Sequence, residues 1–399
     1  MNNRVILCEP QCWGFEHAHL NAALLDTVLW AFPEAVVTFA GEREHVEAVR
    51  KTITRYDPPA EQRTTWKAIP IPARRLWGYP RLGAEWYQSG SILQFAAEQG
   101  AEALIWCSIT NSGLLALKAR LYCRRQRFPI LAIPHCILGS IVNPPARRPW
   151  LWPLGLRQIL RLPHPRNLRC IALSEPIHRC VRQVLPRAAG HFAVLETPYF
   201  WAEQTNQPPP QVPERISFGH LGVANSSKGF DSFLRLAATV TRQTNMSRFV
   251  LAGSVSTPGD YPHAGDDIEG IGSELLTPDE YVRRASSITY AVNLSDPAHY
   301  RLVASGSFLD ALSFVKPVIQ LRNPNVDYYF KKIGDIGYLC DNLDEVQATV
   351  LSLAREMPIA RYRQQCENIL RGRQMFEPKT LARNLRATIH EISAGCGFC

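Results

Sequence analysis

Short apolar runs alternate with amphipathic segments along most of this 399-residue chain, a pattern typical of proteins built from strand–helix units. In the first half, the apolar runs predict strands over 5–7, 35–39, 65–71, 103–108, 129–134 and 170–173. The amphipathic segments predict helices over 16–30, 43–53, 83–99 and 112–127. The last helix is expected to bury one side, formed by Leu114, Leu117, Leu121 and Tyr122. Repeated units of this kind form a parallel sheet with right-handed crossovers.

A proline-rich stretch, Gln204-Thr-Asn-Gln-Pro-Pro-Pro-Gln-Val-Pro213, interrupts the pattern and predicts an extended linker. Beyond it the alternation restarts, with strands expected over 216–221, 248–252, 288–294, 317–321 and 337–339. The helices of this half are expected over 228–241, 278–285, 307–314, 325–332 and from 343 onward. We therefore expect a Rossmann-like N-terminal domain over 1–202, a linker over 203–213 and a second Rossmann-like domain over 214–375. A helix and tail over 376–399 are expected to pack back on the first domain.

Two helix starts in the second half have the features of a phosphate site. The first lies in Gly219-His-Leu-Gly-Val-Ala-Asn-Ser-Ser-Lys-Gly-Phe230, and the second begins at Ser305-Gly306-Ser307. A helix start offers free backbone N–H groups and a positive dipole end, and Lys228 adds a point charge for the same anion. Asp310 lies one helical turn beyond Gly306, within reach of a sugar hydroxyl. Together they predict a nucleotide diphosphate at the carboxyl ends of parallel strands.

Charge divides the chain into two unequal halves. The formal net charge is +9, yet residues 1–200 hold 24 basic against 14 acidic side chains. Between 118 and 187 there are fourteen basic residues against the single acid Glu175. Such a basic region attracts phosphates, whether of lipid headgroups, nucleic acid or a charged substrate.

The remaining composition favours a cytosolic protein. No run of 18 apolar residues exists, and the N-terminus lacks the layout of a signal peptide. The eleven cysteines are expected to be reduced thiols, and the Cys396-Gly-Phe-Cys399 pair is expected to be a frayed tail. No metal-binding spacing, G-x-S-x-G elbow or G-x-G-x-x-G loop is present, so no metal and no cofactor are expected.

Residues 214–345 resemble the nucleotide-sugar-binding domain of family 4 glycosyltransferases, also called glycosyl transferases group 1. The resemblance is carried by 226–231, 249–253, 272–276, 305–312 and 316–319. It implies an α/β protein with the GT-B fold, two facing Rossmann-like domains with an interdomain cleft. It also implies a set of donor-binding residues. These are Lys228, Gly229, Ser305, Gly306 and Ser307 at the diphosphate, Asp310 at the ribose, and Gly253, Leu275 and Leu276 at the base.

The first half resembles the family more loosely. Its Gly14-Phe-Glu-His17 segment lies where the family has a glycine-containing loop before its first long helix, and Ile133-Pro-His135 lies where it often has a histidine near the transferred sugar. Residues 196–200 resemble the strand end before the linker. The resemblance implies that Gly14, Glu16, His17, His135, Tyr300 and Arg301 contact the donor sugar or the acceptor. It implies catalytic roles for His135, Lys228 and Asp310. A core histidine with satisfied hydrogen bonds is the alternative for His135.

Two positions depart from the family pattern. The family usually has an arginine five residues before the Lys-Gly lysine, where this chain has Val223. The first glutamate of its Glu-x7-Glu signature falls on Leu302, and the second is replaced by Asp310. We interpret both departures as variation within an active branch, although Leu302 also fits a protein that has lost its chemistry.

A segment rich in tryptophan, leucine and arginine lies at 147–162. It includes Arg147, Arg148, Trp150, Trp152, Arg157 and Arg161, and it suits the interface of an anionic bilayer or the acceptor. The alternative is a basic surface loop whose tryptophans pack on the domain. Nucleic acid is not an expected partner, because no binding module for it is recognisable.

The resemblance thus implies a retaining glycosyltransferase of surface polysaccharide biosynthesis. It would move a sugar from a UDP- or GDP-linked donor to a glycan or lipid-linked glycan acceptor. It would need no cofactor, and it would be cytoplasmic and peripheral at the inner face of the membrane. Two alternatives stay open, a catalytically inactive scaffold or binding protein and a nucleotide-sugar epimerase of similar two-domain fold.

Overall fold

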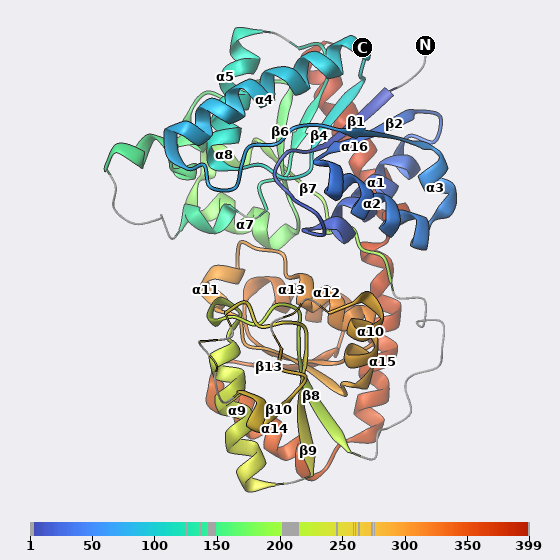
Figure 1. The fold of residues 1–399 in the computed structure, drawn as a ribbon, viewed down its shortest axis with the longest axis vertical. Coiled ribbons are helices and arrows are strands. Elements are labelled where there is room, and N and C mark those ends of the chain that lie inside the picture. Colours follow the sequence, from blue (N-terminus) through green and yellow to red (C-terminus); the bar gives the residue numbers. More distant parts are fainter. Residues whose placement is uncertain are drawn as a thin grey trace. The chain divides into compact units, whose positions relative to one another are not determined.

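A computed structural model describes residues 4–397 except 125, 136, 143–148, 202–214, 245, 258, 260, 262–263, 273 and 275. The expected linker therefore lies outside the described residues. The chain forms two compact units, each with its own sheet (Figure 1). The first unit comprises residues 1–200, 302–304 and 375–399, and the second comprises 201–301 and 305–374.

The described part of the first unit holds a seven-stranded sheet in the order β3-β2-β1-β4-β5-β6-β7. Every pairing in this sheet is parallel. Its strands are β1 (Arg4–Glu9), β2 (Val36–Gly41), β3 (Thr64–Ala68), β4 (Ala103–Trp106), β5 (Ile130–Ala132), β6 (Leu168–Ala172) and β7 (Phe192–Val194).

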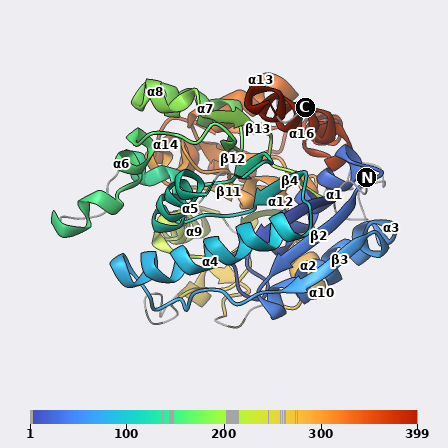
Figure 2. The same cartoon turned by 90° about the horizontal axis from the view of Figure 1, so that it is seen from above.

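Helices cover both faces of this sheet. Successive residues of a strand point to opposite faces, so Val5 and Leu7 enter one core and Ile6 and Cys8 the other. The first core is closed by α1 (Ala18–Ala31), α2 (Arg43–Tyr56) and α16 (Pro378–Cys396), with α3 (Pro58–Gln62) beside α2. The second is closed by α4 (Gly78–Glu98), α5 (Asn111–Cys123), α6 (Leu156–Arg161), α7 (Glu175–Val184) and α8 (Pro186–Ala189). Figure 2 shows α4 and α5 side by side.

The predicted buried face of α5 is wrong at one residue. Leu114, Leu117 and Leu121 are buried, but Tyr122 is 56% exposed. Tyr122 directly follows Leu121, and a step of one residue turns a side chain by about 100° around a helix, so it leaves the buried face.

The described part of the second unit holds a six-stranded parallel sheet in the order β10-β9-β8-β11-β12-β13. Its strands are β8 (Ile216–Leu221), β9 (Ser247–Ala252), β10 (Ile268–Glu269), β11 (Tyr290–Asn293), β12 (Val318–Leu321) and β13 (Gly337–Cys340). Its helices include α9 (Phe230–Gln243), α10 (Pro278–Ser287), α11 (Pro297–Tyr300), α12 (Gly306–Ser313), α13 (Pro324–Ile333), α14 (Leu343–Arg355) and α15 (Ile359–Gly372).

Strand order reverses once in each sheet. In the first unit the chain runs from β1 outward to β3 and then crosses back to β4, on the other side of β1. In the second unit it runs from β8 to β10 and crosses back to β11. The loops after β1 and β4, and after β8 and β11, diverge at these switch points, where open α/β sheets bind ligands. Within the described residues, no helix is long and apolar enough to cross a membrane.

Candidate functional site

Glycines bring the loops of the second unit's switch point together. Gly229 has φ of +74°, and a Cβ on it would lie 2.1 Å from the carbonyl oxygen of Leu294, just beyond β11. A Cβ on Gly253 would lie 1.8 Å from the carbonyl oxygen of Gly222, so the loops after β8 and β9 also touch. Side chains are excluded at both positions, which fixes the floor of the site. Gly253, expected at the base, thus has a packing reason of its own.

Lys228 folds back over the turn that follows β8. It ends a short 3-10 helix (Ser226–Lys228), in which the Asn225 side chain accepts a hydrogen bond from the Lys228 amide at 3.0 Å. The Lys228 Nζ lies 3.6 Å from where a Cβ of Gly222 would be. Burial lowers the pKa of Lys228, and the nearby Asp310 carboxylate opposes this shift. The lysine and the carboxylate expected at the ribose are therefore neighbours.

Helix α12 begins beside these groups. The Ser305 Oγ accepts a hydrogen bond from the amide of Phe308 at 3.3 Å and lies 3.1 Å from the Ser307 Oγ. Ser307 Oγ in turn lies 3.4 Å from the Asn293 Nδ2 at the end of β11. No described atom lies within 4 Å of where a Cβ of Gly306 would be. The Cβ direction of Gly306 therefore points into open space at the helix start, while the Phe308 amide is already bonded to Ser305.

Asp310 is held by a residue that the sequence did not single out. Its Oδ2 accepts a hydrogen bond of 2.8 Å from the Tyr281 hydroxyl of α10. Burial and the adjacent Asp310 both raise the pKa of Tyr281, so the tyrosine remains the donor. A carboxylate has about four acceptor sites, so the bond from Tyr281 alone does not fill them. Leu276 precedes α10 and is half-buried, while Leu275 lies outside the described residues.

His220 lies under this cradle on β8. It is 3% exposed, and its Nε2 has no hydrogen-bond partner among the described residues. Burial first, and then the charge of Lys228, lower its pKa to about 4, so the ring is neutral. His220, Asn293 and Ser307 line a cavity of about 10 Å³, the size of a single water molecule.

The residues around the missing glutamate have separate roles. Leu302 is 1% exposed and belongs to the second core cluster of the first unit. The carbonyl of Tyr300 accepts a hydrogen bond of 2.8 Å from the Asn325 side chain, and burial raises the pKa of its phenol. The Arg301 Nε is buried without a partner among the described residues. Val223 lies 37% exposed in the loop after β8.

In the first unit, two of the expected histidines meet. His17 and His135 are in edge-to-face contact with ring centroids 4.8 Å apart. Neither ring nitrogen of His135 makes a hydrogen bond of normal geometry with a described residue. Burial, and then His17, lower the pKa of His135 to about 3, which keeps it neutral. A backbone hydrogen bond at Ile133 opposes this shift, so His135 is a buried, neutral histidine in contact with His17.

A buried network fixes the loop that carries His17. Glu9, at the end of β1, accepts bonds from the amides of Gln11 at 2.9 Å and Cys12 at 3.2 Å and from the Asn21 Nδ2 at 3.1 Å. The Asn21 Nδ2 also lies 2.9 Å from the His45 Nε2, which must therefore accept. The His45 Nδ1 then donates to the carbonyl of Gly14 at 2.8 Å. The sequence feature that could have revealed this network is the acidic Glu9 directly after the apolar residues 5–8 of strand β1.

Gly14 and Glu16 lie on the same loop. Gly14 has φ of +51°, with no atom within 4 Å of where its Cβ would be. Glu16 accepts a bond from the Trp13 amide at 3.1 Å and forms an ion pair with Arg74 at 2.9 Å. The loop thus offers an open backbone at Gly14 and a carboxylate that is already paired.

A cavity of about 1190 Å³ lies in the first unit, at the carboxyl ends of β1, β4 and β5. Its wall includes Glu16 and also Trp152 and Arg157 from the tryptophan-rich segment. Trp150 and Trp152 are 62% and 65% exposed, so they do not pack into the domain core. Arg161 is exposed outside the cavity, while Arg147 and Arg148 lie outside the described residues.

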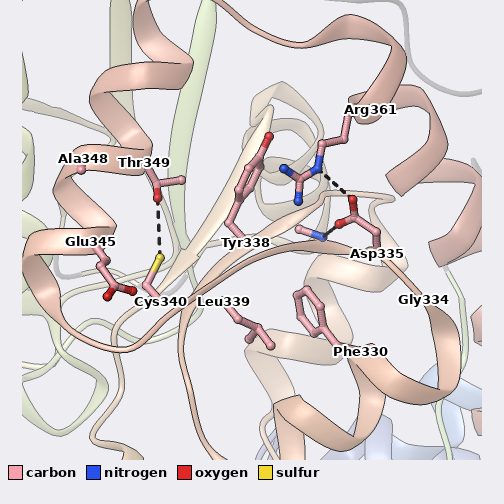
Figure 3. A pocket seen from close by; sticks show the side chains of 11 residues that line it. Phe330, Gly334, Asp335, Tyr338, Leu339, Cys340, Glu345, Ala348, Thr349 and Arg361 are labelled. Atoms are coloured by element: carbon pink, nitrogen blue, oxygen red, sulfur yellow. Dashed lines mark hydrogen bonds and ion pairs between the residues drawn. The ribbon is translucent and has the colours of Figure 1, made fainter.

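A second cavity, of about 670 Å³, lies beside β13 in the second unit (Figure 3). Its charged side chains are engaged with one another or with the backbone. Arg361 forms an ion pair of 2.8 Å with Asp335, and Glu345 accepts a bond of 2.8 Å from the Asp341 amide. The sulfur of Cys340 lies 3.8 Å from the Thr349 hydroxyl. This cavity lies away from the β8/β11 switch point, and we assign no ligand to it.

The described residues contain no cluster of three or more histidine, cysteine, aspartate or glutamate side chains placed to hold a metal ion.

Comparisons with known proteins identify the fold. No protein-family model matches the sequence, and no curated protein matches it. Among solved structures, HepE of Anabaena in complex with UDP and glucose is similar at 12% identity and a TM-score of 0.65, over 98% of this chain and 100% of that one. WaaG, a glycosyltransferase involved in lipopolysaccharide biosynthesis, is similar at 10% identity and a TM-score of 0.61, over 96% and 99%. A glycosyltransferase from Rickettsia africae is similar at 9% identity and a TM-score of 0.65, over 98% of both chains. The chain therefore has the GT-B fold, as the sequence predicted.

Proposed function

We propose that this protein is a glycosyltransferase that binds a nucleotide diphosphate sugar in its second unit and transfers the sugar to an acceptor. One observation carries the proposal, the convergence of Lys228, Asp310 and the start of α12 at the β8/β11 switch point. Its solved neighbour HepE binds UDP and UDP-glucose in a chain of the same fold. That neighbour supports a donor of the same class here.

The proposed chemistry is a substitution at the anomeric carbon. The bond from that carbon to the diphosphate oxygen breaks, and the acceptor oxygen forms a new bond to it. Charge then accumulates on the departing diphosphate, where Lys228 and the first amides of α12 would stabilise it. We propose retention of configuration, with the acceptor proton passing to the departing phosphate oxygen. No side-chain nucleophile and no metal are required.

Lys228→Ala tests the donor site directly. A charge-assisted contact is worth about 1.5–3 kcal/mol, so the variant should bind UDP or GDP more weakly by that amount in a calorimetric titration. Lys331→Ala is the matched control, because Lys331 is exposed on α13 of the same unit and no ion pair involves it in the described residues. Equal affinity of Lys228→Ala and the wild type would refute this site.

Product analysis separates the proposed activity from its alternatives. The proposal predicts a new glycoside whose first-formed anomer, followed by NMR, keeps the configuration of the donor. Binding of UDP-glucose without transfer or hydrolysis would favour an inactive scaffold, for which the buried Leu302 is the best support. An altered donor without a glycoside would indicate an epimerase. An inverted anomer would leave the transferase assignment but overturn retention.

We further propose that the acceptor is a glycan or lipid-linked glycan of a surface polysaccharide, and that the protein works at the inner face of a membrane. The exposed Trp150 and Trp152 and the basic region from 118 to 187 support this location. Flotation with anionic liposomes should carry the protein upward at low salt and release it at high salt. Trp150→Ala should weaken flotation, and Trp30→Ala, an exposed tryptophan on α1, should not. Equal binding to neutral and anionic liposomes would contradict the proposal.

A further inference from the structure

We propose that the cavity of the first unit binds the phosphate end of a single-chain lipid phosphate. This inference rests on the proposed function, in which such an amphiphile would be the lipid part of the acceptor. It assigns a ligand class to a cavity that the sequence did not reveal, because its walls come from five separate parts of the unit.

The position of the cavity favours a ligand site. Gln11, Trp13 and Glu16 come from the loop after β1, and Thr110–Ser112 come from the loop after β4. These loops diverge at the switch point of the first sheet, where the chain leaves a crevice unfilled. At about 1190 Å³, the cavity exceeds the usual size of a small-molecule pocket, about 300–1000 Å³.

One wall of the cavity is apolar. Two segments form it, the start of α4 and the segment before α6, and they touch one another. The Tyr79 hydroxyl donates a bond of 2.7 Å to the carbonyl of Trp150, and a Cβ on Gly78 would lie 3.2 Å from the Leu151 Cδ2. The apolar side chains of this wall are Leu76, Trp77, Leu151, Trp152, Leu154 and Leu156. A hydrocarbon chain laid against them would leave water, which is favourable in proportion to the area covered.

The charges in the cavity leave one cation uncompensated. Arg74 is paired with Glu16 at 2.9 Å, and Arg81 with the buried Glu85 at 2.7 Å. Arg157 also lines the cavity, but it forms no ion pair with any described residue. A guanidinium group presents a planar fork of N–H donors that matches a phosphate. An apolar wall beside an unpaired arginine suits an anionic amphiphile better than a neutral sugar.

Helix α6 holds Arg157 in place. The Lys118 Nζ of α5 donates to the carbonyl of Ile159 at 2.8 Å and to that of Leu162 at 3.0 Å. Lys118 is buried, and it adds bonds to two carbonyls at the end of α6, where carbonyls lack the partners that a continuing helix would supply. The arginine therefore projects from a helix tied to the core, and the apolar wall lies on the segment just before it.

Titration with decyl phosphate below its micelle concentration tests the proposal, with decanol and inorganic phosphate as half-ligands. Tryptophan fluorescence and calorimetry should show decyl phosphate binding at least 10-fold more tightly than either half alone. Arg157→Gln should weaken decyl phosphate about 10-fold or more and leave decanol unchanged. Arg161→Gln is the matched control, because Arg161 is exposed on the same helix outside the cavity. Trp152→Ala provides a second variant, which should weaken both decyl phosphate and decanol.

Several results would overturn the inference. One is decyl phosphate binding no more tightly than inorganic phosphate, and another is Arg157→Gln binding it like the wild type. A third is that Arg157→Gln and Trp152→Ala lose binding to anionic vesicles yet keep monomeric decyl phosphate, which would place the ligand on a surface instead of in the cavity. UDP titration of the wild type distinguishes the two proposals. Normal UDP binding without decyl phosphate binding would refute only this inference. Decyl phosphate binding without UDP binding would refute the proposed donor site in the second unit.

Discussion

Leu302 shows how one apolar side chain removes a polar group from a site. At this position the resembling family has a glutamate, but here an apolar side chain is 1% exposed in a core cluster. A carboxylate at that position would be buried without a partner, which costs several kcal/mol. Leu302 therefore supplies no polar contact at this position, whereas the neighbouring Arg301 has an Nε without a partner among the described residues.

Variants of Asp310 and Tyr281 separate the proposed ribose contact of Asp310 from the hydrogen bond that supports this side chain. Asp310→Asn keeps an acceptor for Tyr281 but removes the charge, so it should lower kcat/KM for the donor about 10²–10³-fold, roughly 3–4 kcal/mol. Tyr281→Phe removes only the 2.8 Å bond and should cost about 10-fold or less. Steady-state kinetics with the best nucleotide sugar is the measurement. If the two variants lose the same activity, Asp310 acts only through Tyr281 and does not contact the ribose.

At the scale of elements, the junction of α1 with the start of α3 carries a pair of acids. Asp26 of α1 is 5% exposed, and its Oδ1 has no hydrogen-bond partner among the described residues. Burial first, and then the charge of Asp57, raise the pKa of Asp26 to about 7. The folded protein therefore keeps a proton that the unfolded chain loses near pH 4, and stability falls as the pH rises from about 4 to 7.

Asp26→Asn should remove that loss. The variant should be more stable than the wild type at pH 8 by about 1–3 kcal/mol, and equal to it near pH 4. Urea unfolding at the two pH values measures the difference. Glu47→Gln is the control, because Glu47 is an exposed acid on the neighbouring helix α2. If the difference in stability between Asp26→Asn and the wild type is the same at pH 8 and pH 4, ionisation of Asp26 does not destabilise the folded protein.

Element boundaries also show what the sequence could predict. The prediction for β8 is confirmed at both ends, and all six of its residues are buried. The first long helix begins at Ala18 instead of 16, since His17 adopts φ of +52° at its start, a conformation no pattern announces. Helix α4 begins at Gly78 instead of 83, where Pro80 is tolerated in the first turn. Strand β10 has only two residues, too few to show an alternation.

At the scale of the whole molecule, two buried histidines and the half-buried His164 make stability depend on acid. Burial is the largest cause that lowers the pKa of His135 and His164 to about 3 and of His220 to about 4. The unfolded chain binds these protons below about pH 6.5, and the folded protein does not. Stability should therefore fall as the pH drops from about 6.5 to 4, by up to about 1.4 kcal/mol per pH unit for each histidine.

Thermal unfolding across this pH range measures the effect. His220→Phe should make Tm less dependent on pH, because the ring lies among Phe230 and Phe233 and an apolar ring takes up no proton. His390→Gln should leave the pH dependence unchanged, because His390 is exposed on α16. An unchanged slope in His220→Phe would mean that His220 is protonated in the folded state.

The site was only partly predictable from the sequence, because some of its residues are neighbours in the chain and others are far apart in it. Lys228 and Gly229 form a local motif, and their place beside a strand end follows from the sequence alone. Tyr281 reaches Asp310 across 29 residues, and Ser108 reaches Glu9 across 99. The cavity of the first unit needs segments from Gln11 to Gln158 together. Such pairings depend on strand order, which periodicity does not encode.

The packing of α16 on α1 has a consequence for synthesis. Helix α1 is buried along almost its whole length, and Leu381, Leu385 and Ile389 of α16 cover part of it. The ribosome makes α16 only after the entire second unit. During translation the first unit is therefore left with an uncovered apolar helix while the second unit can already fold. The nascent chain in that interval presents a surface suited to chaperones that bind exposed apolar segments.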